Sequence, residues 1–274
     1  MGHEEGRNVY RRDKSGLIDV TVPNAARVGD LLHGGAHNFA ADRAVGAGLV
    51  ASAPSVAGIP AAARAFRRRV VRYLAAEAGI RQFLDIGDGM VPPGNTHEVA
   101  QAVDPACRVV YTESDPMVFA HANAVLHAAP GGVVSCIEGD IADVDRMVCG
   151  VAAILDLGQP TAVLLLSTLA HVQSADDAAK VVAALMDAVP AGSQLAIYHL
   201  AGDLDPAMAG ALKHWNAAAP VPIRLRSRDE VAALAVGLDL VPPGVVPVNE
   251  WRPDEGDPPS AVQVPVYGLV ARIP

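Results

Sequence analysis

The chain has 274 residues, of which 51% are hydrophobic, 4% aromatic and 19% charged, and its formal net charge is −9. This length supports a sizeable core, and this composition excludes a largely disordered chain. The excess of acid, with no basic run longer than Arg67-Arg68-Arg69, argues against nucleic acid and anionic membranes as partners.

Three cysteines, Cys107, Cys136 and Cys149, match no metal-binding spacing, and their odd number argues against a disulfide framework. The first residues are polar and carry no apolar signal segment. No apolar run approaches the ~20 residues that span a bilayer. These features predict reduced thiols and a cytoplasmic location.

Residues 1–59 are predicted to form an N-terminal helical extension or lid. A first helix begins near Asn24 and is broken by Gly34-Gly35, and Asp42 begins a second helix that ends by Pro54. The polar and aromatic residues that could meet a substrate there are Arg27, Asn38, Phe39, Asp42 and Arg43. The simpler interpretation is that ion pairs, Arg27 with Asp42 or Asp30 with Arg43, hold the segment to the core. His33 and His37 have helical metal-ligand spacing, but the glycines between them disfavour a metal site, and none is predicted.

Residues 60–274 alternate between helices and strands and are assigned to one main domain. Helices are expected over residues 60–78, 95–103, 116–127, 175–189, 206–215 and 227–236, and strands over residues 82–86, 108–113, 133–138, 161–167, 193–199, 238–248 and 262–273. This alternation predicts an α/β fold with a doubly wound, mostly parallel, seven-stranded sheet. The last two strands have no helix between them and are therefore expected to be antiparallel.

The segment Phe83-Leu84-Asp85-Ile86-Gly87-Asp88-Gly89 reads as a buried strand that ends in a glycine turn, and a helix follows from Asn95. Glycine lets a backbone approach a ligand closely, and a helix N-terminus offers free N–H groups. A nicotinamide site requires Gly-x-Gly-x-x-Gly, but the third glycine position holds Pro92, which disfavours a nicotinamide-dependent oxidoreductase. The segment instead resembles the first motif of class I S-adenosylmethionine-dependent methyltransferases, Asp-Ile-Gly-x-Gly.

That resemblance implies a Rossmann-like fold, S-adenosyl-L-methionine as cofactor, and a set of residues that bind it. Gly87 and Gly89 would meet the methionyl end, and Glu113, at the tip of the second strand, would accept the ribose hydroxyls. Asp140, after the third strand, would meet the adenine amino group, and Ile141 would pack on the ring. The full predicted set is Asp85, Gly87, Asp88, Gly89, Glu113, Ser114, Asp140, Ile141 and Ser167.

Longer blocks resemble an actinobacterial family of S-adenosylmethionine-dependent methyltransferases, formerly a domain of unknown function. They are residues 26–43, with the specific run Asn38-Phe39-Ala40-Ala41-Asp42-Arg43, and residues 66–68, 79–87, 95–101 and 246–253. The resemblance covers nearly the whole chain and implies the fold and the cofactor, but no acceptor.

One position departs from that family, which usually has threonine where this chain has Asp88. A carboxylate there would repel the carboxylate of the cofactor unless it pairs with the amine or points to water. A non-catalytic S-adenosylmethionine-binding protein, a sensor or partner-binding relative, is therefore kept as the alternative to an enzyme.

Methyl transfer requires alignment of donor and acceptor, and it requires a base only when the acceptor must lose a proton. The candidate bases are His171, after the fourth strand, and His199, at the end of the fifth, while Tyr198 is a candidate substrate contact. A hydrogen-bonded histidine at a strand end is the competing interpretation of both. The predicted function is methyl transfer to a small-molecule acceptor. The oligomeric state stays open, with a homodimer as one option.

Overall fold

A single mixed β-sheet organises the computed structural model, which describes residues 19–87, 89–90, 94–254 and 264–274. Its strands are β1 (Gln82–Ile86), β2 (Arg108–Glu113), β3 (Val133–Glu138), β4 (Thr161–Leu166), β5 (Gln194–Leu200), β6 (Asp239–Leu240), β7 (Val246–Pro247) and β8 (Val266–Arg272). They lie in the order β3-β2-β1-β4-β5-β8-β6, and β7 also pairs with β8. Strands β1 to β5 are parallel, and β8 runs antiparallel to β5, β6 and β7.

The predicted parallel sheet with a late antiparallel strand is therefore confirmed, and the bounds of β1, β2 and β3 match the expected ones. One predicted strand, residues 238–248, is instead two pieces of two residues each, so the sheet has eight strands rather than seven. Pro242-Pro243-Gly244 separates the pieces. Proline has no N–H to give a strand ladder, and Gly244 closes a turn by donating its N–H to the Val241 carbonyl at 2.9 Å.

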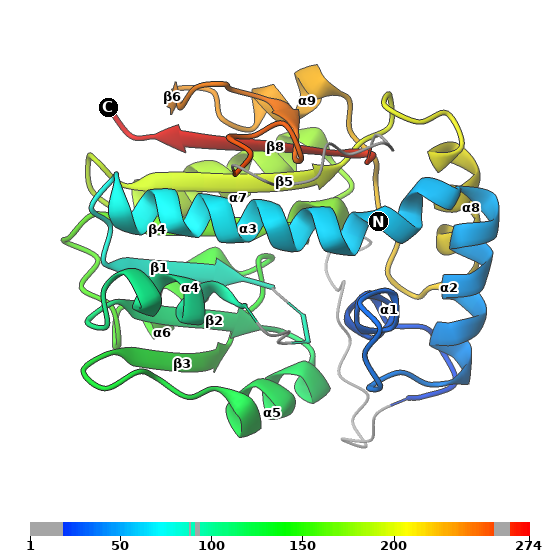
Figure 1. Cartoon of the computed structure of the whole chain (residues 1–274), viewed down its shortest axis with the longest axis horizontal. Coiled ribbons are helices and arrows are strands. Elements are labelled where there is room, and N and C mark those ends of the chain that lie inside the picture. Colours follow the sequence, from blue (N-terminus) through cyan, green and yellow to red (C-terminus); the bar gives the residue numbers. More distant parts are fainter. Residues whose placement is uncertain (1–18, 88, 91–93, 255–263) are drawn as a thin grey trace, which may run out of the picture.

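Helices cover both faces of the sheet (Figure 1). They are α1 (Ala25–Leu32), α2 (Ala40–Ser52), the 3-10 turn η1 (Pro54–Gly58), α3 (Ile59–Ala76), α4 (Thr96–Val103), α5 (Pro116–Val125), α6 (Val144–Val151), the 3-10 turn η2 (Thr168–His171), α7 (Ala175–Asp187), α8 (Met208–Ala218) and α9 (Arg228–Ala233). Apolar side chains of α3, α4 and α5 share one buried cluster with the sheet, and those of α6, α7 and α9 share another. The fold is thus a three-layer α/β sandwich.

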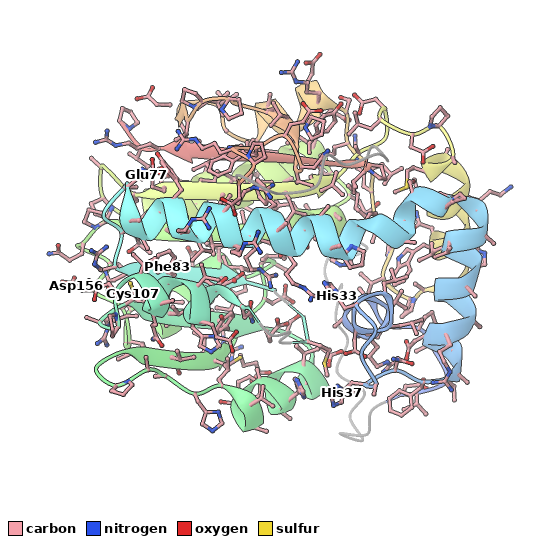
Figure 2. The ribbon with its side chains drawn as sticks, in the orientation of Figure 1. His33, His37, Glu77, Phe83, Cys107 and Asp156 are labelled. Carbon is pink, nitrogen blue, oxygen red and sulfur yellow. The ribbon has the colours of Figure 1, made fainter. Side chains whose placement is uncertain are left out.

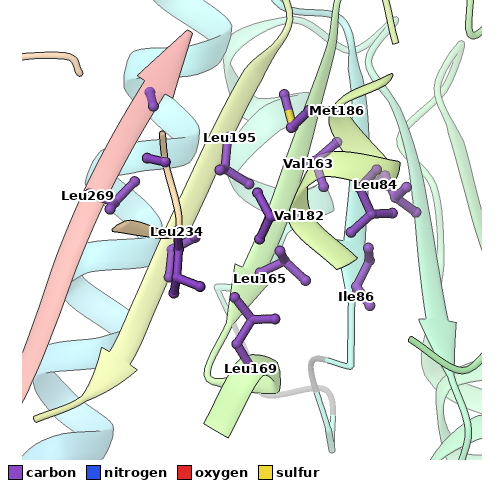
Figure 3. Packing of buried hydrophobic residues seen from close by; sticks show 14 of the residues in the cluster. Leu84, Ile86, Val163, Leu165, Leu169, Val182, Met186, Leu195, Leu234 and Leu269 are labelled. Atoms are coloured by element: carbon purple, nitrogen blue, oxygen red, sulfur yellow. The ribbon is translucent and has the colours of Figure 1, made fainter. Parts of the chain in front are cut away.

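The amino ends of the parallel strands lie at one end of the molecule, and their carboxyl ends lie toward the other. Figure 2 shows Glu77, Cys107 and Asp156, near the amino ends of the strands, at one end, and His33 and His37 at the other. Strands β1 and β4 are buried along their whole length, as expected of a sheet covered on both faces. Figure 3 shows one of the two cores, in which Val163 and Leu165 of β4 pack near Val182 of α7.

Two helices begin with capping boxes. Asn95 accepts from the Thr96 N–H at 2.9 Å while Glu98 accepts from the Asn95 N–H at 3.2 Å. Ser227 and Glu230 make the same reciprocal arrangement at α9. Helix α2, by contrast, begins at Ala40, two residues before the predicted start. The reason is that Asp42 lies inside the first turn of the helix, where its carboxylate accepts from the Phe39 N–H just before the helix.

Helices α1, α2 and α8 lie beyond the carboxyl ends of the parallel strands (Figure 1). They share a third buried cluster that includes Val28 of α1, Leu49 of α2 and Trp215 of α8. This packing holds α1 over the edge of the sheet where β1, β2, β3 and β4 end.

Within the described ranges, no single helix is long and apolar enough to cross a membrane. Helices α2 and Pro54–Ala76 pass that test only jointly, across a bend of 117°.

Candidate active site

A cavity of about 520 Å³ lies at the carboxyl ends of the parallel strands, with α1 on its far wall. Ligands of open α/β sheets bind at this edge. Of the residues predicted to bind a cofactor, those that line the cavity are Gly87, Gly89, Glu113, Ser114, Asp140, Ile141 and Ser167. Four strand ends that are far apart in the sequence therefore contribute residues to one cavity. Asp88 lies outside the described residues.

The glycine turn after β1 forms a bare backbone edge on the cavity wall. Gly87 and Gly89 have φ angles of 67° and 77°, which L side chains rarely adopt. A Cβ on Gly87 would stand 2.9 Å from Cγ2 of Thr168, so a side chain is also sterically excluded there. The turn is fixed from below, where the Gly87 N–H donates to the Thr112 carbonyl at 2.9 Å.

Glu113 ends β2 beside that turn and is 6% exposed. Its Oε1 accepts from the Gly89 N–H at 2.7 Å. Burial, with smaller contributions from the charges of Asp85 and Asp115, raises the pKa of Glu113 to about 8, although the Gly89 hydrogen bond acts in the opposite direction. A carboxyl group with so perturbed a pKa in a cavity is a candidate functional group.

Asp85 does not line the cavity, which corrects its predicted direct contact with the cofactor. It is 0% exposed, and the Thr96 hydroxyl donates to its Oδ2 at 2.5 Å. Burial raises the pKa of Asp85, and the charge of Arg67 and the Thr96 bond offset this in part. The reason lies in strand alternation, which turns Asp85 toward α4 rather than toward the strand end. Asp85 thus ties β1 to the first residue of α4.

The chain leaves β4 through an unusual backbone conformation at Ser167. Its φ of 78° is left-handed, which is uncommon for a residue other than glycine. Its N–H donates to the Tyr198 carbonyl at 3.0 Å, which ties the turn to β5. Strain of this kind concentrates at functional sites. The turn places Ser167, Thr168 and His171 on the cavity wall.

His171 lines the cavity, and its ring Nδ1 is buried without a hydrogen-bond partner among the described residues. Burial lowers the pKa of His171, and hydrogen bonding to the Pro222 backbone offsets this only in part. The ring is therefore neutral at neutral pH. Trp215, Pro220 and Val221 also line the cavity, and the Trp215 Nε1–H donates to the Val221 carbonyl at 2.9 Å. His171 thus shares the cavity wall with these apolar side chains.

His199 lies in the core and not on the cavity, so the prediction that it acts as a base is not supported. It is 0% exposed. Its Nδ1 bonds the Leu200 carbonyl at 2.9 Å, and its Nε2 lies 2.5 Å from Nη1 of Arg226. Because a carbonyl only accepts and a guanidinium only donates, both nitrogens are committed. Burial lowers the pKa of His199 to about 4, so the ring is neutral. Tyr198, its neighbour, does line the cavity.

The predicted lid residues hold the N-terminal segment together instead of facing the cavity. Arg27 Nε lies 2.8 Å from Asp42 Oδ2, and both side chains are buried. Asp42 also accepts from the Phe39 N–H at 2.8 Å, and Arg43 donates to the Asn38 carbonyl at 3.0 Å. Arg27, Asn38, Phe39, Asp42 and Arg43 are absent from the described lining of the cavity.

The first of the two ion pairs suggested by the sequence is therefore present, and the second is replaced. Asp30 does not pair with Arg43; its carboxylate accepts from the His37 N–H at 2.8 Å and from the Asn38 side chain at 3.2 Å. Asn24 ties the segment to the main sheet. Its side-chain nitrogen donates to Asp115 Oδ2 at 2.8 Å, while its oxygen caps α1.

A family model described as S-adenosyl methyltransferase matches residues 11–274. The chain belongs to this family. The sequence-based expectation of an S-adenosylmethionine-dependent methyltransferase with a Rossmann-like class I fold is thereby confirmed.

Two solved structures agree with that assignment. A DUF574 family protein of Streptomyces avermitilis shares 34% identity and a TM-score of 0.90, over 93% of this chain and 99% of that one. A protein from Thermobifida fusca, whose name assigns it to the methyltransferases, shares 34% identity and a TM-score of 0.85, over 93% and 96%. The mitomycin 7-O-methyltransferase resembles this methyltransferase in fold alone, with 18% identity and a TM-score of 0.50 over 80% and 56%. No curated protein matches.

Some lining residues of the methyltransferase were not predicted from the sequence. Arg64 of α3, Trp215 of α8 and Pro220 and Val221 beyond it reach the cavity through the packing of helices on the sheet. Arg64 carried no distinguishing signal, because it belongs to a helix with several arginines. Trp215 could have been noticed as a rare residue type, since the chain has only two tryptophans.

Over the described part of the methyltransferase, no three His, Cys, Asp or Glu side chains are grouped as metal ligands. His33 and His37 are not on one helical face, because α1 ends at Leu32. The His37 ring instead lies 4.7 Å, centroid to centroid, from the ring of His121.

Proposed function

We propose that this methyltransferase binds S-adenosylmethionine in the cavity and methylates a small acceptor that carries an O–H or N–H group. The observation that supports this most strongly is the convergence of the glycine turn, Glu113, Asp140 and His171 on one cavity. A volume of about 520 Å³ lies in the range of small-molecule sites. The net charge of −9 speaks against nucleic acid or an anionic membrane as the substrate.

Each part of the cofactor has a matching group on the wall. Gly87 and Gly89 would hold the methionyl chain through close backbone contact. Glu113, in its ionised form, would accept both ribose hydroxyls. Asp140 and Ile141 would meet the adenine, with Ser114 and Ser167 at the neighbouring strand ends. When bound, the cofactor supplies a methyl group that is activated by positively charged sulfur.

The protein's own contribution is mainly to align the acceptor and to exclude water. Alignment of two reactants can supply much of a rate enhancement. Trp215, Pro220 and Val221 provide an apolar wall against which an acceptor would pack. His171, whose neutral ring lines the cavity, would accept the acceptor's proton.

The segment of residues 1–59, of which the structure describes residues 19–59, is proposed to act as a lid over this site. Pro23, Asn24 and Gly29 of that segment line the cavity opposite the strand ends. The bond between Asn24 and Asp115 would hold the lid closed. The non-catalytic alternative depended on Asp88, which lies outside the described residues, and no described feature favours it.

Binding and turnover together test the proposal. Titration calorimetry should show that the wild-type protein binds S-adenosylhomocysteine and S-adenosylmethionine, and that NAD gives no heat. Incubation with methyl-labelled S-adenosylmethionine and a panel of small phenols, alcohols and amines should transfer label to one class of them. A protein that binds neither cofactor form would contradict the proposal, and binding without transfer to any acceptor would favour the non-catalytic alternative.

A further inference from the structure

Charged side chains of both signs line the cavity. The acids are Glu113 at the end of β2, Asp115 and Asp140 after β2 and β3, and Asp30 of α1, whereas the guanidinium groups of Arg64 and Arg67 come from α3. S-adenosylmethionine carries a carboxylate at its methionyl end. A carboxylate removed from water needs a cation or several N–H donors.

Arg64 is a guanidinium on the cavity wall that has no hydrogen bond or ion pair among the described residues. It is half-buried and lines the cavity, and its Nε is buried without a hydrogen-bond partner among the described residues. Its neighbours on α3 are committed. Arg67 donates to Asn95 Oδ1 at 2.8 Å, and Arg69 donates to the Val248 carbonyl at 2.6 Å. Arg68 pairs with Asp254 at 3.3 Å.

His33 and Asp30, which line the cavity together with Arg64, form no ion pair or hydrogen bond with it. His33 lies beside α1 (Figure 2), and its Nδ1 is 2.8 Å from the Gly29 carbonyl. Partial burial lowers the pKa of His33, and the charges of Arg64 and Arg67 lower it further. His33 is therefore neutral near neutral pH. Asp30 also lines the cavity, but its carboxylate is bonded to the loop that follows α1.

We propose that Arg64 binds the carboxylate of the cofactor's methionyl end. This inference rests on the proposed function, because it assumes that S-adenosylmethionine occupies the cavity. A guanidinium presents parallel N–H groups that match a carboxylate, and such charge-assisted pairs are stronger than neutral hydrogen bonds. The pair would fix the methionyl chain along the glycine turn and so orient the sulfur. Arg64 would then be a determinant of cofactor specificity. The sequence gives no signal for it, because α3 contains several arginines.

A second cavity, of about 360 Å³, offers Arg64 a different possible ligand. Arg64 and His33 line both cavities and form part of the wall between them. Arg68 lines only the second cavity, one helical turn further along α3. Substitution of Arg68 is therefore the matched control, since it makes the same chemical change on the same helix without touching the first cavity.

The test is a thermodynamic cycle in which both the protein and the ligand are varied. Calorimetry would measure the affinity of the wild type, Arg64→Gln and Arg68→Gln for S-adenosylhomocysteine and for its decarboxylated analogue, which keeps the amine and the adenosine. Arg64→Gln should weaken S-adenosylhomocysteine binding by about 10- to 100-fold, as expected for the loss of a charge-assisted pair. It should leave the affinity for the decarboxylated analogue within about twofold of wild type, and Arg68→Gln should change neither affinity. Thermal unfolding would show that each variant is folded, and Arg64→Lys, which keeps the charge, would replace a variant that is not.

Three outcomes would overturn the inference. If Arg64→Gln binds S-adenosylhomocysteine as the wild type does, Arg64 does not hold the cofactor, and a carboxylate on the acceptor becomes the candidate. If both ligands lose affinity equally, Arg64 acts through the structure of the site. If Arg68→Gln causes the same selective loss, the effect comes from the charge of the helix. If the wild type binds neither ligand, it is the proposed function that fails.

Discussion

At the scale of single residues, Glu113 makes the cofactor affinity of this methyltransferase dependent on pH. Burial raises the pKa of Glu113 to about 8, so the folded protein without ligand holds this carboxyl mostly protonated at neutral pH. Ribose hydroxyls donate best to the ionised form, which means that binding below pH 8 must first release a proton. Affinity for S-adenosylhomocysteine should therefore rise with pH, by up to about tenfold per unit, and level off above the pKa.

Calorimetry between about pH 6 and pH 9 would check this, with Glu113→Gln as the control. The variant should bind more weakly, because an amide cannot accept from both hydroxyls, and its affinity should lose the pH dependence. A pH dependence that survives in Glu113→Gln would assign the titration to another group.

His171 should affect turnover and not cofactor binding. Its neutral ring lines the cavity and can take a proton, so His171→Gln should lower kcat by about 10²- to 10⁴-fold on an acceptor with an ionisable proton. The affinity for S-adenosylhomocysteine should stay near the wild-type value. Steady-state kinetics with a separate binding titration would distinguish the two effects. Equal losses in kcat and in cofactor affinity would contradict a role as base and indicate a packing role.

At the scale of elements, the behaviour of α1 should depend on Asn24. This residue caps α1 and also bonds Asp115, which itself caps α5 by accepting from the Met117 N–H at 2.8 Å. Asn24→Ala should therefore destabilise the protein by about 1 kcal/mol through loss of the cap. It should also raise amide hydrogen exchange in residues 25–32 selectively.

Ser174→Ala provides the matched control, because Ser174 caps α7 away from the cavity. Urea unfolding should give a similar loss of stability for both variants, while hydrogen exchange measured by mass spectrometry should rise in α1 only for Asn24→Ala. An unchanged exchange of α1 would show that packing against α2 and α8, and not this bond, holds the lid.

The accuracy of the sequence-based predictions also differs between elements. Strands β1, β2 and β3 were located correctly because short runs rich in β-branched and aromatic residues, each followed by glycine or ending in an acid, are typical of strands. The starts of α4 and α9 were predicted to within one residue, and both lie at capping boxes, which are local signals. The prediction of one strand over residues 238–248 was wrong in its middle, because Pro242 and Pro243 have no N–H to donate to a strand ladder.

The residues of the site also differ in how well the sequence predicts their positions. Glu113, Asp140 and Ser167 were predictable because the carboxyl ends of parallel strands meet at one edge. Arg64 and Trp215 were not, since their place depends on how α3 and α8 pack against the sheet. The role of His199 was misjudged because its partner, Arg226, is 27 residues away in the sequence and only the folded chain brings them together.

At the scale of the whole molecule, ligand binding should stabilise the fold by mass action. S-adenosylhomocysteine at about 100 times its Kd should add about 2.7 kcal/mol to the free energy of unfolding. For a chain of this length that corresponds to a rise in Tm of roughly 5 °C. Differential scanning fluorimetry would measure the shift, and NAD at the same concentration should give none. Equal shifts with both compounds would point to a general nucleotide site.

The central claim is that the cavity at the carboxyl ends of β1 to β4 is where the methyltransferase holds its cofactor. The most direct measurement is a crystal structure of the wild-type protein with S-adenosylhomocysteine. We expect the ribose hydroxyls within hydrogen-bond distance of Glu113, the methionyl chain along Gly87 and Gly89, and the sulfur facing the corner that holds His171. Density for the ligand outside this cavity, or a ribose that does not contact Glu113, would contradict the account.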